Sequence, residues 1–397
     1  MNRKLVVIVF IGLFLIMASI AGWADTDVKD LKLISTFEGG KLYKADKVNV
    51  LELHGNYRQM GRQYGKLMKN QLNGLYDTAI NNYFIKKKGL SNELIKEASR
   101  HLFSMYPRRF KEIYYGMSET SGMDLEKLII LDQLFIYVLF SSSSAECSGI
   151  AAWGEYTSGK PLVFGRNFDY PACYREFAKF FTIVVYNPDD GSIPTANIGY
   201  AGQIIVLTGM NKASIFIENN DGTISGGSIF YDNRIPFYIL ELGFLLDFSS
   251  LSQLNAALHS TRSDFTYIVN VADKNEAYSY EMATFGVKRR AGVKKGLLVA
   301  TNHFVDPSWG ISEPFNDKPH LTMLRRKNLL AQAEKYKGKF NAKKMMDILD
   351  IPIDKGGVTR PKHTIYQIVA VPEKLRFWLK LPGYQDWVRI DLDPLFK

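Results

Sequence analysis

The chain of 397 residues is long enough to bury the core of one large or two ordinary domains. Its hydrophobic share of 46% and charged share of 23% are those of a globular protein, which excludes a disordered or fibrous chain. The formal charge of +10 is dispersed in short, separated runs, so we expect a solvated surface and no nucleic-acid partner.

The first residues have the layout of a secretory signal peptide. A positive start precedes an uncharged stretch from Leu5 to Ala21, and small residues then lead into an acidic segment. We expect cleavage after Ala24, or as a second choice after Ala21, and therefore an exported protein, periplasmic or secreted. The alternative is an uncleaved anchor, although the apolar run is slightly short of the ~20 residues of a spanning helix. Membrane contact is expected only through residues 1–24.

Extended segments at 32–53 are followed by a helical block at about 57–140. Apolar and aromatic positions recur at helical spacing, and Ser91, Pro107 and Asp124 are typical residues at a helix start. The helices expected in this block cover residues 57–84, 91–104, 107–120 and 124–140.

From Cys147 onward the chain changes to short apolar runs punctuated by Gly, Asn and Asp, a pattern typical of antiparallel strands. Helices and strands then alternate in groups, without βαβ units, which predicts an α+β fold with two antiparallel sheets between helices. The later segments expected are helices at 234–260, 318–336 and 342–350, and strands at 364–371, 375–380 and 387–391.

The common catalytic signatures are missing from the sequence. It has no G-x-S-x-G, H-E-x-x-H, P-loop or G-x-G-x-x-G pattern, so no metal and no cofactor is expected. The six histidines are scattered, which is more typical of structural roles. Cys147 and Cys173 can form at most one disulfide bridge.

Cys147 precedes a predicted strand pair whose second strand carries Arg166 and Asp169. If the chain broke before Cys147, one residue would hold both a thiol and an α-amine, whose pKa of about 7.7–8.0 suits a general base. A nearby guanidinium would lower the pKa of the thiol, and a carboxylate would orient the amine. Taken singly, the cysteine also fits a buried strand position and the other two fit a surface ion pair.

The stretch CSGIAAWGEYTSGKPLVFGRNFDY, residues 147–170, resembles the start of the mature catalytic chain in cysteine N-terminal-nucleophile (Ntn) hydrolases. This superfamily includes the choloylglycine hydrolase and penicillin V acylase group, the acid ceramidases and the penicillin acyltransferases. The resemblance covers about residues 50–335. Its further matching segments are LHGNYRQMGRQYGKL (53–67), TGMNKASIFIENND (208–221), ATNHF (300–304) and HLTMLRRKNLL (320–330).

The resemblance implies a four-layer αββα sandwich with self-cleavage at the Glu146–Cys147 bond. Residues 25–146 would then form a helical pro-region or α-chain, and residues 147–397 the catalytic domain or β-chain. Cys147 would be the nucleophile and, through its freed amine, the base. Arg166 would stabilise the thiolate and contact the substrate, and Asp169 would hold the α-amine.

Three further positions have implied roles. Asn302 would donate to the oxyanion, and Arg325 would complete the charged network, with Arg326 as its rival. Asn220 would take the remaining asparagine role, with Asn219 as its rival.

The implied reaction is hydrolysis of a carbon–nitrogen bond other than a peptide bond, through a thioester. The expected partner is a small N-acyl amide, such as an acyl amino acid, an acylated signal molecule, a conjugated bile acid or a penicillin. Acyl transfer to an amine and a non-catalytic binding protein on the same scaffold are the alternatives. The sequence leaves the acyl and amine parts of the substrate, and the oligomeric state, open.

Overall fold

The computed structural model describes residues 31–135, 146–313 and 316–397, to which all structural statements here refer. The expected signal peptide, 1–24, lies outside the described residues, as does the last part of the helix expected at 124–140. In the described part of the chain, no helix is both long and apolar enough to cross a bilayer.

Two β-sheets form the centre of the fold, and within each sheet neighbouring strands pair antiparallel except for β3 and β6. The ten-stranded sheet has the spatial order β1 (Lys32–Phe37), β2 (Gly40–Ala45), β3 (Val48–Gly55), β6 (Phe181–Pro188), β7 (Thr195–Tyr200), β8 (Thr208–Asn211), β9 (Phe216–Asp221), β10 (Tyr267–Ala272), β11 (Ala277–Ala283) and β12 (Gly286–Arg290). The six-stranded sheet has the order β13 (Leu297–Ala300), β4 (Ser148–Ala152), β5 (Val163–Asp169), β14 (Thr364–Val371), β15 (Arg376–Leu381) and β16 (Gln385–Asp391).

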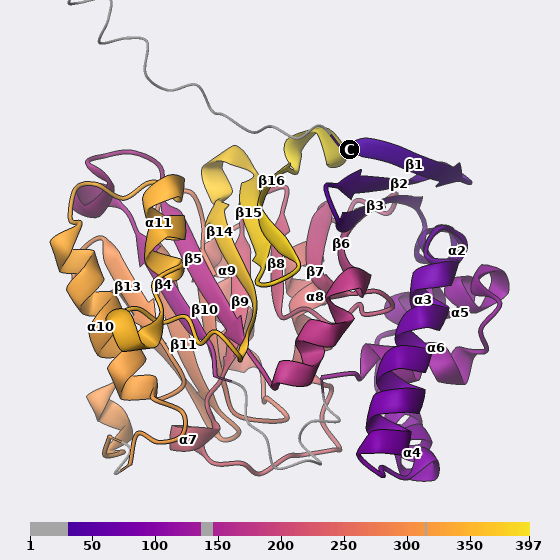
Figure 1. The fold of residues 1–397 in the computed structure, drawn as a ribbon, viewed down its shortest axis with the longest axis horizontal. Helices are drawn as coiled ribbons and strands as arrows, with labels where there is room; N and C mark the ends of the chain where they lie inside the picture. Colours follow the sequence, from indigo (N-terminus) through magenta and orange to yellow (C-terminus); the bar gives the residue numbers. More distant parts are fainter. Residues whose placement is uncertain (1–30, 136–145, 314–315) are drawn as a thin grey trace, which may run out of the picture. The chain divides into compact units, whose positions relative to one another are not determined.

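The expected helical block is present, and Figure 1 shows it beside β1–β3. The helix predicted at 57–84 is divided into three pieces, and the helix predicted from 124 to 140 ends at Asp132. The elements of the block are α2 (Tyr57–Leu67), α3 (Lys69–Leu75), the π-helical η1 (Tyr76–Lys87), α4 (Asn92–Ser104), α5 (Arg108–Ser121) and α6 (Leu125–Asp132).

Glycines bring α2 against α5. A Cβ atom on Gly61 would collide with the backbone of Ile113, and one on Gly116 would collide with the backbone of Arg58. Gly65 likewise faces the backbone of α5. The Met-Gly-x-x-x-Gly pattern of α2 therefore serves close packing of two helices, because only glycine leaves room for this approach.

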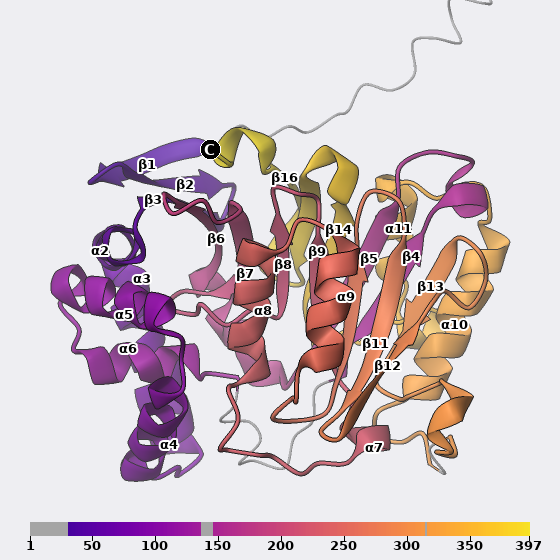
Figure 2. The same ribbon diagram turned by 180° about the vertical axis from the view of Figure 1, so that it is seen from behind.

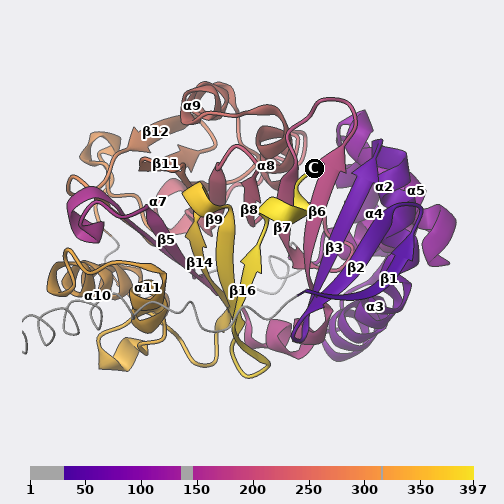
Figure 3. The same ribbon diagram turned by 90° about the horizontal axis from the view of Figure 1, so that it is seen from above.

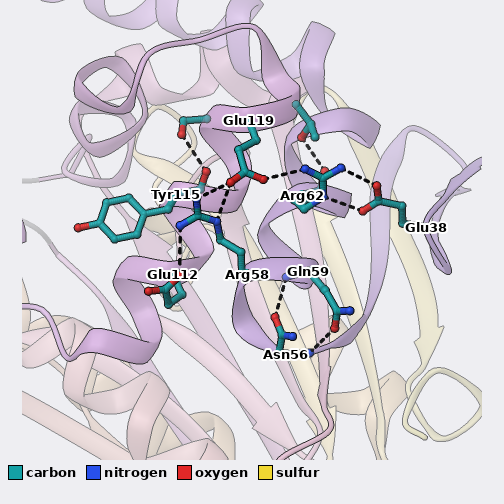
Figure 4. A network of polar contacts seen from close by, with 10 residues as sticks. Glu38, Asn56, Arg58, Gln59, Arg62, Glu112, Tyr115 and Glu119 are labelled. Carbon is teal, nitrogen blue, oxygen red and sulfur yellow. Dashed lines mark hydrogen bonds and ion pairs between the residues drawn. The ribbon is translucent and has the colours of Figure 1, made fainter.

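A surface network of ion pairs surrounds this glycine contact (Figure 4). Arg62 pairs with Glu38 at 2.6 Å and with Glu119 at 2.7 Å, and Arg58 pairs with Glu112 at 3.2 Å and also with Glu119. These five side chains are 31–41% exposed, so each pair contributes less than about 1 kcal/mol. The close packing of the two helices, more than the charges, therefore fixes α2 on α5.

The two sheets face each other. The rings of Phe164 on β5 and Phe216 on β9 have centroids 4.9 Å apart, and the hydroxyls of Thr208 on β8 and Tyr366 on β14 are 2.9 Å apart. These contacts close the interior between the sheets, where most of the buried apolar side chains gather.

Helices cover the outer faces of both sheets. Figure 3 shows α10 and α11 on one side of the strands and α8 and α9 on the other, and Figure 2 shows the second pair from behind. The α+β class is confirmed, and helices pack on both sheets as expected. The exact four-layer sandwich stays a prediction. The covering helices are α8 (Phe237–Asp247), α9 (Leu251–Ser260), α10 (Thr322–Lys335) and α11 (Ala342–Leu349).

Some connections differ from their prediction. The helix expected at 234–260 is broken, because Ser250 caps the start of α9 by accepting the N–H of Gln253 at 3.3 Å. A 3-10 helix follows β5, and the β4–β5 connection contains another. The short segments are η3 (Gly154–Thr157), η4 (Ala172–Phe180), α7 (Thr223–Gly226), η5 (Pro307–Trp309), η6 (Ile353–Lys355), η7 (Pro372–Lys374) and η8 (Asp393–Leu395).

Candidate active site

The six residues singled out in the sequence come from five parts of the fold. Cys147 immediately precedes β4, two residues lie on β5, one lies on β9, one follows β13 and one lies on α10. Each is at most 1% exposed: Cys147, Arg166, Asp169, Asn220, Asn302 and Arg325.

The guanidinium of Arg166 lies against the thiol. The antiparallel pairing of β4 with β5 sets Gly149 opposite Arg166, and Arg166 Nη2 reaches Cys147 Sγ at 3.8 Å. The same guanidinium donates to Thr208 Oγ1 at 2.6 Å and to the carbonyl of Asn219 at 2.6 Å. It is therefore fixed from both sheets.

Burial dominates the ionisation of the thiol. It raises the pKa of Cys147 to about 11, against the lowering effect of Arg166. The carboxylates of Asp169 and Glu218 raise the pKa further. In the uncut chain the thiol is accordingly neutral at pH 7, although the guanidinium of Arg166 lies beside it.

Asp169, at the end of β5, contacts the residue that precedes the bond expected to be cut. Its backbone carbonyl accepts the N–H of Glu146 at 2.9 Å, and its Oδ1 accepts from Thr364 Oγ1 at 2.6 Å. Its buried Oδ2 has no hydrogen-bond partner among the described residues. Burial raises the pKa of Asp169 to about 7, against the charge of Arg325 and the Thr364 hydrogen bond.

Arg325, not Arg326, reaches the site. Its Nη1 donates to the carbonyl of Cys147 and, at 2.7 Å, to Ser148 Oγ, and its Nη2 donates to Asn302 Oδ1 at 2.7 Å. Arg326 is only partly buried; burial lowers its pKa, against the charges of Glu313 and Glu281. The two rivals therefore point to different surroundings.

Strand alternation likewise separates the two asparagines of β9. Asn220 Nδ2 lies 3.4 Å from the carbonyl of Thr301, next to Asn302 in the space between the sheets. Asn219 Nδ2 instead lies 3.3 Å from Glu241 Oε2 on α8, in the outer layer. Asn220 is thus the asparagine whose side chain faces the site.

Asn302 is held on both ends of its side-chain amide. Its Oδ1 accepts from Arg325, and its Nδ2 donates to the carbonyl of Asp221 at 2.9 Å. Its backbone N–H donates to Thr322 Oγ1 at 2.9 Å, which ties the loop after β13 to the start of α10.

Glu218 belongs to the site, although sequence reasoning missed it. It is fully buried on β9, its Oε2 is 3.2 Å from Arg166 Nε, and its Oε1 accepts from Asn270 Nδ2. A buried guanidinium needs such a countercharge. The sequence did offer one signal, because Glu218 is an acid that directly follows the apolar run Ile215–Ile217. Its partner on β5, Arg166, is revealed only by the fold.

Neither a metal site nor a disulfide bridge is seen in the described ranges. No group of His, Cys, Asp and Glu among those residues is arranged to hold a metal ion. Cys147 and Cys173 are both free thiols. The described residues of the site contribute one thiol, two guanidinium groups, two carboxyl groups and side-chain amides.

Comparison with known proteins finds distant relatives. No family model matches the chain. It is 25% identical over 283 residues to protein dcd1B of Dictyostelium discoideum, covering 64% of this chain and 55% of that protein. For protein dcd1A of the same organism the identity is 24% over 215 residues, covering 45% and 47%. The chain spans about half the length of the curated relatives it matches.

Three solved structures have a low similarity to this one. An N-acylethanolamine-hydrolyzing acid amidase ortholog of Caenorhabditis elegans has a TM-score of 0.42 at 18% identity, covering 57% of this chain and 93% of its own. A conjugated bile acid hydrolase mutant of Clostridium perfringens has a TM-score of 0.43 at 14% identity, with coverages of 62% and 93%. The penicillin V acylase of Agrobacterium tumefaciens has a TM-score of 0.42 at 10% identity, with coverages of 63% and 88%.

Proposed function

We propose that the chain cuts itself between Glu146 and Cys147 and then hydrolyses N-acyl amides with Cys147 as nucleophile. One observation carries this proposal: a buried thiol lies against the guanidinium of Arg166, within the electrostatic influence of the Asp169 carboxyl, and the residues on either side of the adjoining peptide bond are held by hydrogen bonds. Export through residues 1–24 belongs to the same proposal.

Hydrogen bonds on either side of the Glu146–Cys147 bond support the self-cleavage step. The Glu146 N–H is fixed on the Asp169 carbonyl, and the Cys147 carbonyl is fixed by Arg325. Cys147 Sγ attacks the carbonyl carbon of Glu146, the C–N bond breaks, and the leaving nitrogen takes a proton. Water then hydrolyses the thioester, which leaves a carboxylate on Glu146 and a free thiol and amine on Cys147.

Asp169 is suited to move the proton in this step. With a pKa of about 7, its carboxyl exists in both protonation states near neutral pH, which favours a general acid–base group. After the cut, the new α-amine would lie beside Asp169 Oδ2, the buried oxygen that has no partner in the described residues. Asp169 would then orient the amine as a general base for the thiol.

Hydrolysis of a substrate would use the same groups a second time. The amine takes the thiol proton, and Arg166 stabilises the thiolate that attacks the substrate carbonyl. The side-chain amides of Asn302 and Asn220, which in the uncut chain donate to the carbonyls of Asp221 and Thr301, would stabilise the oxyanion. The C–N bond breaks, the amine leaves with a proton, and water releases the acid from the thioester.

An activity panel tests the proposal. Wild type, Cys147→Ala and Cys173→Ala are compared on N-acyl amides that differ in acyl length and in the amine. Wild type and Cys173→Ala should hydrolyse at least one member at similar rates, and Cys147→Ala should be about a thousandfold slower or worse. Full activity of Cys147→Ala would contradict the proposal.

Acyl transfer is the second candidate for the same site, because an amine can attack the thioester in place of water. Adding a primary amine to the assay and identifying the products separates the two reactions. A new amide at the expense of the free acid would assign the transferase reaction.

A further inference from the structure

The guanidinium of Arg360 and the imidazole of His320 hold the residue that precedes the nucleophile. The carboxylate of Glu146 pairs with Arg360, and its Oε1 lies 3.1 Å from His320 Nδ1. The side chains of Glu146, Arg360 and His320 are 10%, 14% and 25% exposed. We call Arg360 with His320 the anion receptor. It lies at the edge of the site, where its side chains are mostly buried but keep some exposure to solvent.

The receptor is fixed to the site by short links. The backbone N–H of Arg360 donates to Thr364 Oγ1 at 3.0 Å, and that hydroxyl donates to Asp169 Oδ1 at 2.6 Å. The backbone carbonyl of His320 accepts from Arg325 Nε at 3.3 Å. Arg360 is thus linked to Asp169 through one residue, Thr364, and the backbone of His320 is bonded directly to Arg325.

The charges around the receptor favour a carboxylate. Arg360 presents a planar fork of donors that matches a carboxylate, and its charge does not depend on pH in the working range. His320 adds a ring nitrogen, with the carboxylates of Asp221 and Asp317 and the cation of Arg325 acting on its other sides. When Glu146 withdraws, Arg360 is left half-buried beside the site, where an anion is its natural partner.

We propose that, after self-cleavage, this receptor binds a carboxylate on the acyl part of the substrate; the inference rests on the proposed function. In self-cleavage the attacked carbonyl belongs to Glu146, so the Glu146 side chain lies on the acyl side of the reacting bond. A substrate carbonyl attacked by the same Sγ takes the same place. An acyl group as long as glutaryl then brings its carboxylate to Arg360, so the substrate class is linear monoamides of short dicarboxylic acids.

The reaction on such a substrate is balanced without any further reagent. Sγ bonds to the amide carbon of the glutaryl group, the C–N bond breaks, and the amine leaves with a proton. Water hydrolyses the thioester, which releases the dicarboxylic acid and restores the thiol. The receptor takes no part in the bond changes; it orients the acyl group.

Matched substrates and variants test this assignment. N-glutaryl and N-pentanoyl p-nitroanilide have acyl chains of equal length and differ in the terminal carboxylate. Wild type should favour the glutaryl compound by about tenfold or more in kcat/KM. Arg360→Gln should bring the ratio of the two kcat/KM values towards one, mainly by raising KM for the glutaryl compound. Arg108→Gln, an exposed arginine at the start of α5, should behave as wild type.

A second measurement needs no variant, so it stands even if Arg360→Gln fails to fold. Glutarate should inhibit wild-type hydrolysis of the pentanoyl compound competitively, and pentanamide should not. Equal rates on both anilides together with no inhibition by glutarate would overturn the inference and leave the proposed function intact. A preference for a carboxylate on the amine side instead would overturn the acyl-side assignment. A wild-type chain that stays uncut and hydrolyses nothing would overturn the proposed function as well.

Discussion

Arg166 is the residue on which the buried charges of the site depend. Its guanidinium is fully buried and contacts the thiol of Cys147 and the carboxylate of Glu218. Burying a guanidinium costs several kcal/mol unless a partner charge and hydrogen bonds compensate. Glu218 supplies that charge, so it is a positioning residue for Arg166, and its own charge also raises the pKa of the Cys147 thiol.

Replacing Glu218 tests this dependence. In the uncut Cys147→Ala background, Glu218→Gln should lower the free energy of unfolding by about 3 kcal/mol, because the charge of Arg166 loses its buried partner. Urea denaturation at pH 7 measures the change. Glu276→Gln, an exposed glutamate before β11, is the matched control and should change stability by less than about 0.5 kcal/mol. Equal effects of the two variants would contradict the assigned role of Glu218.

Asp169 predicts a pH dependence of stability with a definite sign. Its pKa in the folded chain is about 7, whereas an unfolded aspartate has a pKa of about 3.9. Between these values the folded chain keeps a proton that the unfolded chain has lost. The stabilising contribution is therefore complete below about pH 4 and lost as pH rises through about 7, by up to about 4 kcal/mol.

The difference between two uncut proteins isolates this contribution from that of other buried acids. Unfolding free energies of Cys147→Ala and Cys147→Ala/Asp169→Asn are compared from pH 4 to pH 8. Their difference should change across this range, with the aspartate protein losing more stability as pH rises. Parallel curves would show that Asp169 titrates at an ordinary aspartate pKa.

The end of α6 is the element that joins the helical block to the site. Asp132 is fully buried, and its Oδ1 accepts the N–H groups of Ile204 at 2.9 Å and Ile205 at 3.3 Å. Its Oδ2 accepts from the hydroxyl of Tyr106. The loop held in this way leads directly to Leu207 and Thr208, which accept hydrogen bonds from Arg166. The helical block thus helps to position the guanidinium.

Asp132→Asn should weaken this link. An asparagine would place an N–H group where Oδ2 now accepts a hydrogen bond from the hydroxyl of Tyr106. The free energy of unfolding should therefore fall by about 1–3 kcal/mol, and kcat/KM should fall too. Denaturation and steady-state kinetics measure both effects. Asp124→Asn on the same helix is the control, because asparagine caps a helix about as well as aspartate. If Asp132→Asn matched this control, α6 would have no such role.

Local pattern was enough to predict helices whose ends carry clear signals. Apolar spacing and end signals correctly predicted α4 and α5. They could not predict the break of 57–84 at Met68, because α2 packs on α5 whereas α3 contacts η4, and no local pattern records a change of partner. The early end of α6 has a similar cause: Asp132 and the residues after it bond to segments distant in sequence.

For the site, the sequence identified residue types, and the fold resolved the ambiguities between neighbours. Arg325 and Arg326 have the same chemistry, and only the rotation of α10 determines which of them reaches the site. Asn219 and Asn220 are likewise distinguished only by which face of β9 each side chain is on. Glu218 stayed hidden because a buried acid is defined by a partner on another strand. Register between distant strands is a tertiary property that a single sequence does not display.

On the scale of the whole molecule, both expected fragments contribute to one sheet. β3, before the proposed cut, pairs in parallel with β6, after it, from Asn49↔Thr182 to Gly55↔Pro188. The sequence predicted extended segments at 32–53 but not that they would extend this sheet. Because the shared sheet and its apolar core cross the cut, cleavage should not release the pro-region.

Size-exclusion chromatography checks this expectation. The cut protein should elute as a single peak that contains both fragments on a denaturing gel, and the fragments should separate only in denaturant. The uncut Cys147→Ala protein provides the reference elution volume. Separate elution of the two fragments under native conditions would contradict the shared core.

The mass of the purified protein tests the central claim most directly. Wild type and Cys147→Ala are expressed in parallel, and their intact masses and N-terminal sequences are measured. Wild type should give two polypeptides, one of them starting with Cys147 as CSGIAAW, and Cys147→Ala should give a single uncut chain. An uncut, inactive wild type would contradict the account, and an uncut but active wild type would show that the α-amine is not the base.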